Sequence, residues 1–196
     1  MSTETNIDGK KLLVKDHIVT WSNFISLTRV VIVLPIIIIH IQNDREINYA
    51  IVLLISYGVL SDYLDGLVAR KRDEISELGK VLDPVADKLM AFFLFLYVVM
   101  LGWIPYWYFA IGVVRDLTIM AGSAHIKKER GKVAMSIMSG KISVNIMALY
   151  WVSVFFFREA ETVQTWLLWI SVAFMIYSFA DYWIRYKKIM DGAEFN

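Results

Sequence analysis

Residues 62–87 read DYLDGLVARKRDEISELGKVLDPVAD, and four aspartates lie in or beside apolar sequence within this stretch. If its first part is helical, Asp62 and Asp65 share one helix face with Gly66 and Ala69, at positions i, i+3, i+4 and i+7. We therefore expect an acidic face on a helix that is otherwise apolar.

A second helix in the same stretch would place Gly79, Asp83 and Asp87 on one face, at i, i+4 and i+8. The charged segment 70–77 separates the two helices. An antiparallel pair joined by this segment would bring the two acidic faces together.

Such an acidic cluster is costly in a membrane, where one aspartate costs roughly 2.5–3.5 kcal/mol on insertion scales. Divalent cations would remove this cost, and carboxylate oxygens favour Mg²⁺, Mn²⁺ or Ca²⁺, bound as one ion or as two. The alternative is a set of aspartates at helix ends that reach water. Four acidic residues with two glycines on the same faces favour the metal site. The glycines would admit a bulky group to the backbone or allow close packing of the helices.

Composition indicates a membrane protein. Apolar residues make up 58% of the 196 residues and the mean hydropathy is +0.54, whereas soluble domains contain about 45–50% apolar residues. The net charge of +1 argues against a nucleic-acid partner. The absence of cysteine excludes disulfides and thiol chemistry.

Six apolar segments approach the length of about 20 residues that a membrane-spanning helix needs. We predict an all-α integral membrane bundle of six transmembrane helices, with the approximate bounds 23–41, 47–69, 78–101, 105–126, 135–157 and 163–186. Residues 10–21 mix lysines with apolar side chains, which favours an N-terminal amphipathic surface helix over an ordinary linker. The predicted parts are a tail with the surface helix (1–22), the six-helix domain (23–187) and a C-terminal tail (188–196).

Basic residues gather in four segments, namely Lys10 to Lys15, Arg70 to Lys80, Lys127 to Lys132 and Arg185 to Lys188. With six spans these segments lie on one side, which the positive-inside rule assigns to the cytoplasm. We therefore expect a multi-pass protein of a bacterial inner membrane, with both termini and the acidic site cytoplasmic.

Four further basic residues lie inside or at the ends of apolar segments: Arg29, Lys88, Arg115 and Lys141. Charges within membrane spans are rare and usually functional. Arg29 has the alternative of snorkelling to the interface, and Lys88 that of pairing with Asp87 or Asp83. Arg115 directly precedes Asp116, so we expect the two side chains on different helix faces.

The three histidines, His17, His40 and His125, lie near predicted membrane edges, where we expect them to be interfacial. A carboxylate of the acidic cluster is therefore the better candidate for a general base.

The spacing Asp62-x2-Asp65-Gly66-x2-Ala69-Arg70-x8-Gly79-x3-Asp83-x3-Asp87 resembles, at every fixed position, the signature of the CDP-alcohol phosphotransferases. The resemblance implies transfer of a phosphoalcohol group from a CDP-linked donor to an alcohol, with release of CMP. It also implies a six-helix membrane fold with a preceding surface helix, commonly as a homodimer.

The resemblance further implies roles for single residues. Asp62, Asp65, Asp83 and Asp87 would bind the divalent metal, two ions of Mg²⁺ or Mn²⁺, and Asp87 would also be the base for the acceptor hydroxyl. The residues that would lie against the cytidine diphosphate are Asn23, Asp65, Gly66, Ala69, Arg70 and Gly79. Asn23 is included because the family pattern on the first helix has an Asn three residues before a Ser or Thr and six before an Arg, here Ser26 and Arg29.

Arg115 and Lys141 resemble positions at which relatives bind the phosphate of the acceptor. Glycerol-phosphate transferases often show a Gly-Lys-x-Lys-Thr run, whereas this chain has Ser143 in place of the second lysine. The Arg115–Asp116 pair also resembles cardiolipin synthases, whose acceptor is phosphatidylglycerol.

We expect CDP-diacylglycerol as the donor, because the site lies at the membrane edge, and glycerol 3-phosphate as the small alcohol acceptor. The alternatives within the family are a cardiolipin synthase and transferases of the inositol-phosphate, serine or aminoalcohol type. Outside the enzyme class, the alternative is a cation transporter that uses the aspartates as its ion site.

Overall fold

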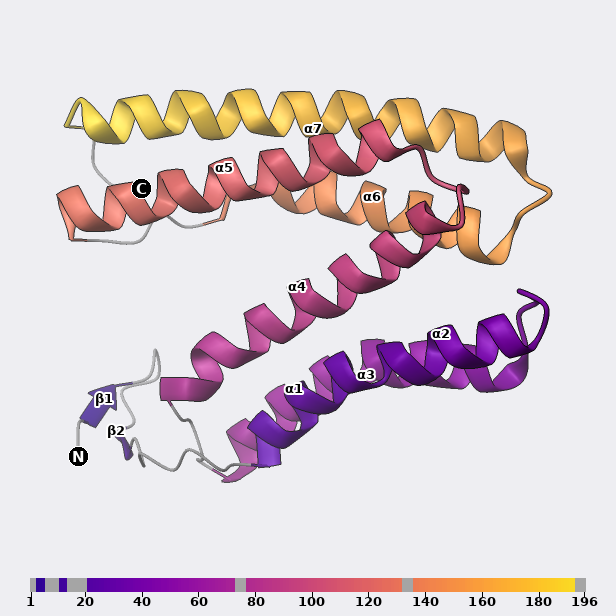
Figure 1. The fold of residues 1–196 in the computed structure, drawn as a ribbon. Helices are drawn as coiled ribbons and strands as arrows, with labels where there is room; N and C mark the ends of the chain where they lie inside the picture. The colour runs from indigo at the N-terminus through magenta and orange to yellow at the C-terminus, as the bar shows by residue number, and fades with distance from the viewer. Residues whose placement is uncertain (1–2, 6–10, 14–20, 73–76, 132–135, 193–196) are drawn as a thin grey trace. The chain divides into compact units, whose positions relative to one another are not determined.

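The computed structural model describes the backbone of residues 3–5, 11–13, 21–72, 77–131 and 136–192, and the side chains of residues 24, 26–61, 85–131 and 136–192. The chain forms two compact units, Met1–Tyr97 and Val98–Asn196. Each unit is described by itself below, and the helices carry the labels of Figure 1.

The first apolar segment of unit Met1–Tyr97 forms two short helices, α1 (Trp21–Val31) and α2 (Val33–Gln42), with one residue between them. Pro35 explains the break, because proline has no N–H to donate to the carbonyl of Val31 and its ring crowds that carbonyl. Helical hydrogen bonds continue on both sides, from Ile32 N to Thr28 O and from Ile36 N to Ile32 O. The two helices are therefore one kinked element.

Helix α3 (Tyr49–Arg72) returns along α1 and α2, as Figure 1 shows. Asn48 begins it, because its side-chain Oδ1 accepts a hydrogen bond from the Ile51 N–H at 3.0 Å. The Thr28 and Tyr57 hydroxyls join α1 to α3 through a hydrogen bond of 2.9 Å.

Helix α4 (Glu77–Met100) completes this unit and runs past its boundary. Nδ1 of His40 on α2 and the Tyr97 hydroxyl on α4 share a hydrogen bond of 2.7 Å, and His40 is fully buried. A hydrogen-bonding partner on another helix allows this imidazole to be buried, and its position at the membrane interface stays a prediction. His17 lies outside the described residues.

The second unit, Val98–Asn196, contains three long helices, α5 (Tyr106–Arg130), α6 (Met138–Phe156) and α7 (Glu161–Met190). Figure 1 shows α5 and α7 running in the same direction and α6 in the opposite one. Each of these helices is long and apolar enough to cross a membrane, the only ones to meet that criterion in the described part of the chain. Ser26–Gln42 and Tyr49–Ser61 are shorter apolar helical stretches.

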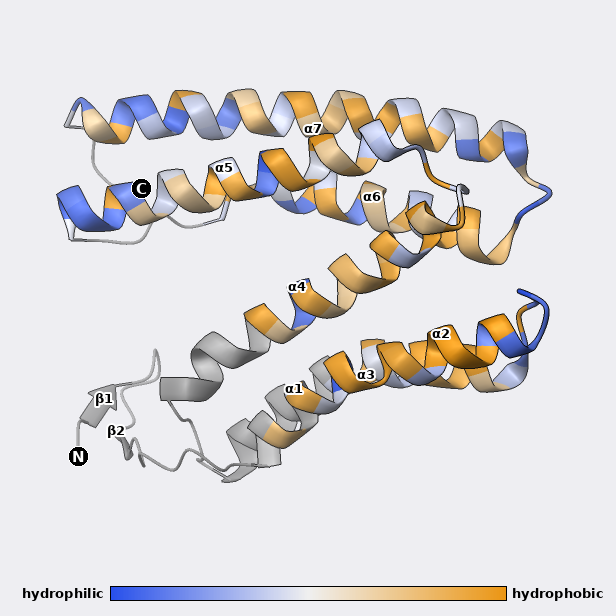
Figure 2. Ribbon diagram, in the orientation of Figure 1, coloured by the Kyte–Doolittle hydropathy of each residue, from blue (hydrophilic) through white to orange (hydrophobic). Residues whose placement is uncertain are grey.

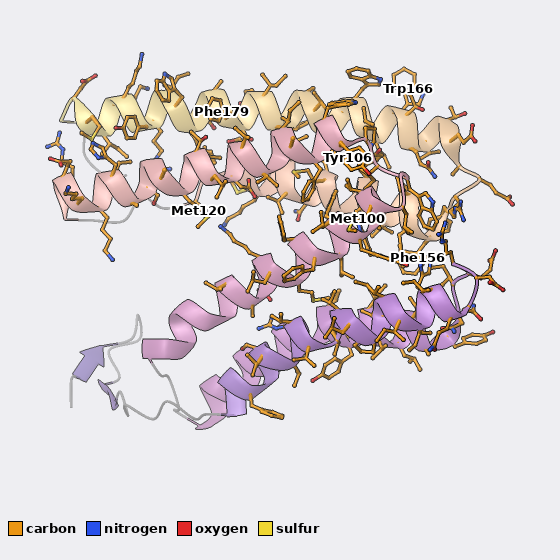
Figure 3. All side chains as sticks on the ribbon, in the orientation of Figure 1. Met100, Tyr106, Met120, Phe156, Trp166 and Phe179 are labelled. Atoms are coloured by element: carbon orange, nitrogen blue, oxygen red, sulfur yellow. The ribbon has the colours of Figure 1, made fainter. Side chains whose placement is uncertain are left out.

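Large apolar side chains project outward from these helices. Trp166 on α7 and Met120 on α5 are 67% and 50% exposed, and both are labelled in Figure 3. Burying such side chains in lipid removes them from water, which is the expected surface of a membrane protein. The helical character of the six predicted segments is confirmed, whereas their number as transmembrane spans stays a prediction.

The N-terminal surface helix was predicted wrongly at residues 11–13. Strand β2 (Lys11–Leu13) pairs antiparallel with β1 (Thr3–Thr5), and Glu4 lies opposite Leu12. Threonine and neighbouring apolar residues suit an extended backbone, and pairing two such segments satisfies their N–H and C=O groups. Residues 14–20 of the predicted helix lie outside the described part.

Candidate active site

The signature residues fall on two continuous helices, as the spacing predicted. Those on α3 are Asp62, Asp65, Gly66, Ala69 and Arg70, and those on α4 are Gly79, Asp83 and Asp87. Asn23 lies in α1. Apart from Asp87, the side chains of these residues lie outside the described part, so their metal-binding and nucleotide-binding roles stay predictions.

Asp87 forms an ion pair with Arg29. The Nη1 atom of Arg29 lies 2.6 Å from Oδ1 of Asp87, with side-chain exposures of 1% for Arg29 and 45% for Asp87. The structure does not favour the alternative of a snorkelling Arg29, because this partner on α4 stabilises the guanidinium inside the unit. Asp87 is thus paired with a buried guanidinium, while its own side chain stays partly exposed.

Asp87 can supply one of the carboxylate ligands that the predicted metal site needs. Its side chain offers hard oxygen ligands, is not fully buried, and lies in the signature at the i+4 position from Asp83 on the same helix. Lys88, the alternative partner considered for Asp87, is exposed.

Arg115 lies on the inner side of α5, where its side chain is 5% exposed. Its Nη1 donates to Oδ1 of Asp116 at 2.6 Å and its Nη2 donates to Oγ of Ser178 on α7 at 2.7 Å. As expected, the two side chains lie on different faces of α5, buried for Arg115 and 47% exposed for Asp116, and the long arginine side chain reaches the neighbouring carboxylate. Nε of Arg115 is buried and has no hydrogen-bond partner among the described residues.

Lys141 lies in the first turn of α6, where it is exposed. The turn is held by α7. The Ser139 hydroxyl donates to Oδ2 of Asp181 at 2.6 Å, and the Ile137 N–H donates to the Tyr182 hydroxyl at 3.4 Å. Arg115 and Lys141 thus lie on two different helices that both bond to α7.

Sequence reasoning missed the residues of α7 that make these contacts. Ser178, Asp181 and Tyr182 occupy positions i, i+3 and i+4, so they share one face of an otherwise apolar helix. That periodicity is the signal that would have found them.

Comparison with known proteins identifies a family over most of the chain. The family model of CDP-alcohol phosphatidyltransferases matches residues 19–177, which include every signature position.

Two relatives have the same name. A CDP-diacylglycerol–glycerol-3-phosphate 3-phosphatidyltransferase of Aquifex aeolicus is 28% identical over 180 residues, covering 86% of this chain and 96% of that protein. An enzyme of that name from Mycoplasma genitalium is 28% identical over 195 residues, covering 84% of this chain and 82% of the relative.

A relative with another name matches a shorter part. A putative cardiolipin synthase of Mycobacterium bovis is 26% identical over 126 residues, covering 64% of this chain and 59% of that protein. The family match spans both compact units and therefore most of the chain. The chain belongs to the CDP-alcohol phosphatidyltransferase family and is a membrane enzyme of phospholipid synthesis.

Proposed function

We propose that the enzyme transfers the phosphatidyl group of CDP-diacylglycerol to glycerol 3-phosphate. The products are phosphatidylglycerophosphate and CMP. The names of the relatives from Aquifex aeolicus and Mycoplasma genitalium support this acceptor.

The observation that carries the acceptor assignment is the buried guanidinium of Arg115. Ser178 and Asp116 fix two of its nitrogens, and Nε has no partner among the described residues. A guanidinium that is held in one direction is suited to bind phosphate. Lys141 would add a second, exposed cation.

In the proposed reaction the acceptor hydroxyl attacks the β-phosphorus of the donor. Its proton passes to the carboxylate of Asp87, a new P–O bond forms, and the bond from that phosphorus to the CMP oxygen breaks. Arg29 holds Oδ1 of Asp87 and so orients the carboxylate. Asn23, Asp65, Gly66, Ala69, Arg70 and Gly79 are the proposed contacts of the cytidine diphosphate.

Asp62, Asp65, Asp83 and Asp87 would hold two divalent ions, Mg²⁺ or Mn²⁺. When bound, such ions neutralise negative charge on the phosphates and on the departing CMP. The enzyme would act as a homodimer in a bacterial inner membrane. Its active site and both termini would lie on the cytoplasmic side.

The test is release of CMP by the purified protein in detergent, with CDP-diacylglycerol, Mg²⁺ or Mn²⁺ and one acceptor at a time. We expect release with glycerol 3-phosphate and none after chelation of the metal with EDTA. Release with phosphatidylglycerol alone would identify a cardiolipin synthase instead, the activity named for the Mycobacterium bovis relative.

Variants at Arg115 and Lys141 test the phosphate contacts. Arg115→Ala and Lys141→Ala should raise the KM for glycerol 3-phosphate much more than the KM for CDP-diacylglycerol. Equal rises in both constants would contradict the assignment.

A further inference from the structure

One face of α7 contacts both helices that carry the proposed phosphate-binding cations. Ser178 is fully buried and contacts α5, whereas Asp181 and Tyr182, almost one turn further on, contact the start of α6.

The contact to α5 fixes the guanidinium of Arg115. The Ser178 hydroxyl donates its own proton to the Met175 carbonyl at 3.1 Å, which leaves the oxygen to accept from Arg115 Nη2 at 2.7 Å. An acceptor that is itself bonded to its helix backbone has few alternative rotamers. The direction of the guanidinium is therefore set by α7.

The contact to α6 fixes the turn that carries Lys141. Ile137 lies at the N-cap of α6 and supplies no side-chain hydrogen bond, and its N–H donates instead to the Tyr182 hydroxyl of another helix, while Asp181 accepts from the Ser139 side chain. The carboxylate of Asp181 also lies at the positive end of the α6 dipole, which is favourable for an anion.

Close packing limits movement of this turn. A Cβ added at Gly140 would lie 2.7 Å from both Cε2 and the hydroxyl oxygen of Tyr182. Only glycine allows the ring to lie this close to the α6 backbone, directly before Lys141.

We propose that Ser178, Asp181 and Tyr182 are positioning residues that fix Arg115 and Lys141 for binding the acceptor phosphate. This inference rests on the proposed function. Affinity for the acceptor then depends on residues of α7 that act through Arg115 and Lys141 and not by contact with the acceptor.

The test compares Ser178→Ala with Ser178→Thr and with Ser171→Ala in the purified full-length enzyme. Ser171 is a matched control, because it is also fully buried on α7 and its hydroxyl donates to the carbonyl three residues earlier, Leu168. KM and kcat are measured separately for glycerol 3-phosphate and for CDP-diacylglycerol, after size-exclusion chromatography confirms folded protein.

We expect Ser178→Ala to raise the KM for glycerol 3-phosphate about tenfold, the effect of losing one charge-assisted hydrogen bond. The KM for the donor should stay near that of the wild type, and Ser178→Thr should restore most of the affinity. Ser171→Ala should leave both constants unchanged.

A second arm uses Ser139→Ala, Asp181→Ala and the double variant. If Asp181 acts through Ser139, the double variant should raise the acceptor KM no further than the stronger single variant. Additive effects would overturn this part of the inference.

The two proposals fail in different ways. A wild-type enzyme that does not use glycerol 3-phosphate overturns the proposed function and this inference together. If the wild type uses it and Arg115→Ala raises the acceptor KM, but Ser178→Ala behaves like Ser171→Ala, only the positioning role is overturned.

Discussion

Arg29 and Asp87 form a charge pair with very unequal access to the surroundings. The guanidinium is 1% exposed and the carboxylate is 45% exposed. Pairing stabilises a buried cation in an apolar unit, whereas the side chain of Asp87 stays partly exposed. The same contact thus stabilises α1 against α4 and orients the proposed base.

Asp87→Asn should lower kcat by about 10²–10⁴-fold, because the amide cannot accept the proton of the acceptor hydroxyl. The measurement is CMP release at saturating substrates, on protein that elutes as the wild type does. Lys88→Gln is the matched control, since Lys88 is the exposed neighbour on the same helix, and it should retain full activity. Full activity in Asp87→Asn would exclude this residue as the base.

At the scale of single residues, the sequence pointed to Asp87 as a candidate base but did not predict its ion pair with Arg29. The spacing of the aspartates is a local pattern on one or two helices. The contact with Arg29 depends on how distant helices pack. Arg115 and Asp116 show a second limit, because helix-face rules follow the direction of Cβ and not the reach of a long side chain.

At the scale of the elements, α7 is the helix against which α5 and α6 pack in the second unit. Small and polar residues of α7 face inward: Ser171 and Ser178 are fully buried. The Gly140–Tyr182 contact is the closest of its kind in this unit among the described glycines. The effect of this close contact on stability can be measured by thermal unfolding.

Gly140→Ala should destabilise the protein by about 1–3 kcal/mol, because the added methyl group overpacks against the Tyr182 ring. Gly122→Ala on α5 is the control, since its Cβ would meet its nearest atom, Cδ2 of Tyr186, at an ordinary 3.7 Å. Thermal unfolding in detergent measures both. Tyr182→Leu removes the clashing atoms, so Gly140→Ala should destabilise the protein less in that background. Equal melting temperatures for Gly140→Ala and Gly122→Ala would contradict overpacking at Gly140.

Apolar segment length predicted the helical elements well, because a long run of apolar residues has few other ways to satisfy its backbone. The predicted segment 163–186 corresponds to Glu161–Met190, and 78–101 corresponds to Glu77–Met100. The β1–β2 pairing was missed, since lysines among apolar residues also fit an amphipathic helix. Composition alone did not separate these two structures.

At the scale of the whole molecule, basic residues gather at one end of unit Val98–Asn196, namely Lys127, Lys128 and Arg130 of α5 and Lys187 and Lys188 of α7. Arg130 at the end of α5 donates from Nη2 to the Ile189 and Met190 carbonyls at the end of α7, both at 2.8 Å. Figure 2 shows hydrophilic residues gathered at these two helix ends. At the start of α7, the Arg158 guanidinium lies 3.9 Å from the ring centroid of Trp103.

This polarity predicts the orientation in the membrane. The chain has no native cysteine, so single cysteines can be labelled selectively. In intact cells an impermeant maleimide should label Glu159→Cys but not Lys128→Cys, because the positive-inside rule places the lysine-rich end in the cytoplasm. Permeabilised cells should show labelling at both positions, and the reverse pattern in intact cells would contradict the proposed orientation.

Transfer of the phosphatidyl group to glycerol 3-phosphate should occur together with release of CMP. The most direct measurement supplies glycerol 3-phosphate with a ³²P label and compares the label in the extracted lipid with the CMP released. We expect one mole of label in the lipid for each mole of CMP released, because the acceptor keeps its phosphate when its hydroxyl attacks the donor. Release of CMP without label in the lipid would mean that water or another alcohol is the acceptor, and would contradict the claim.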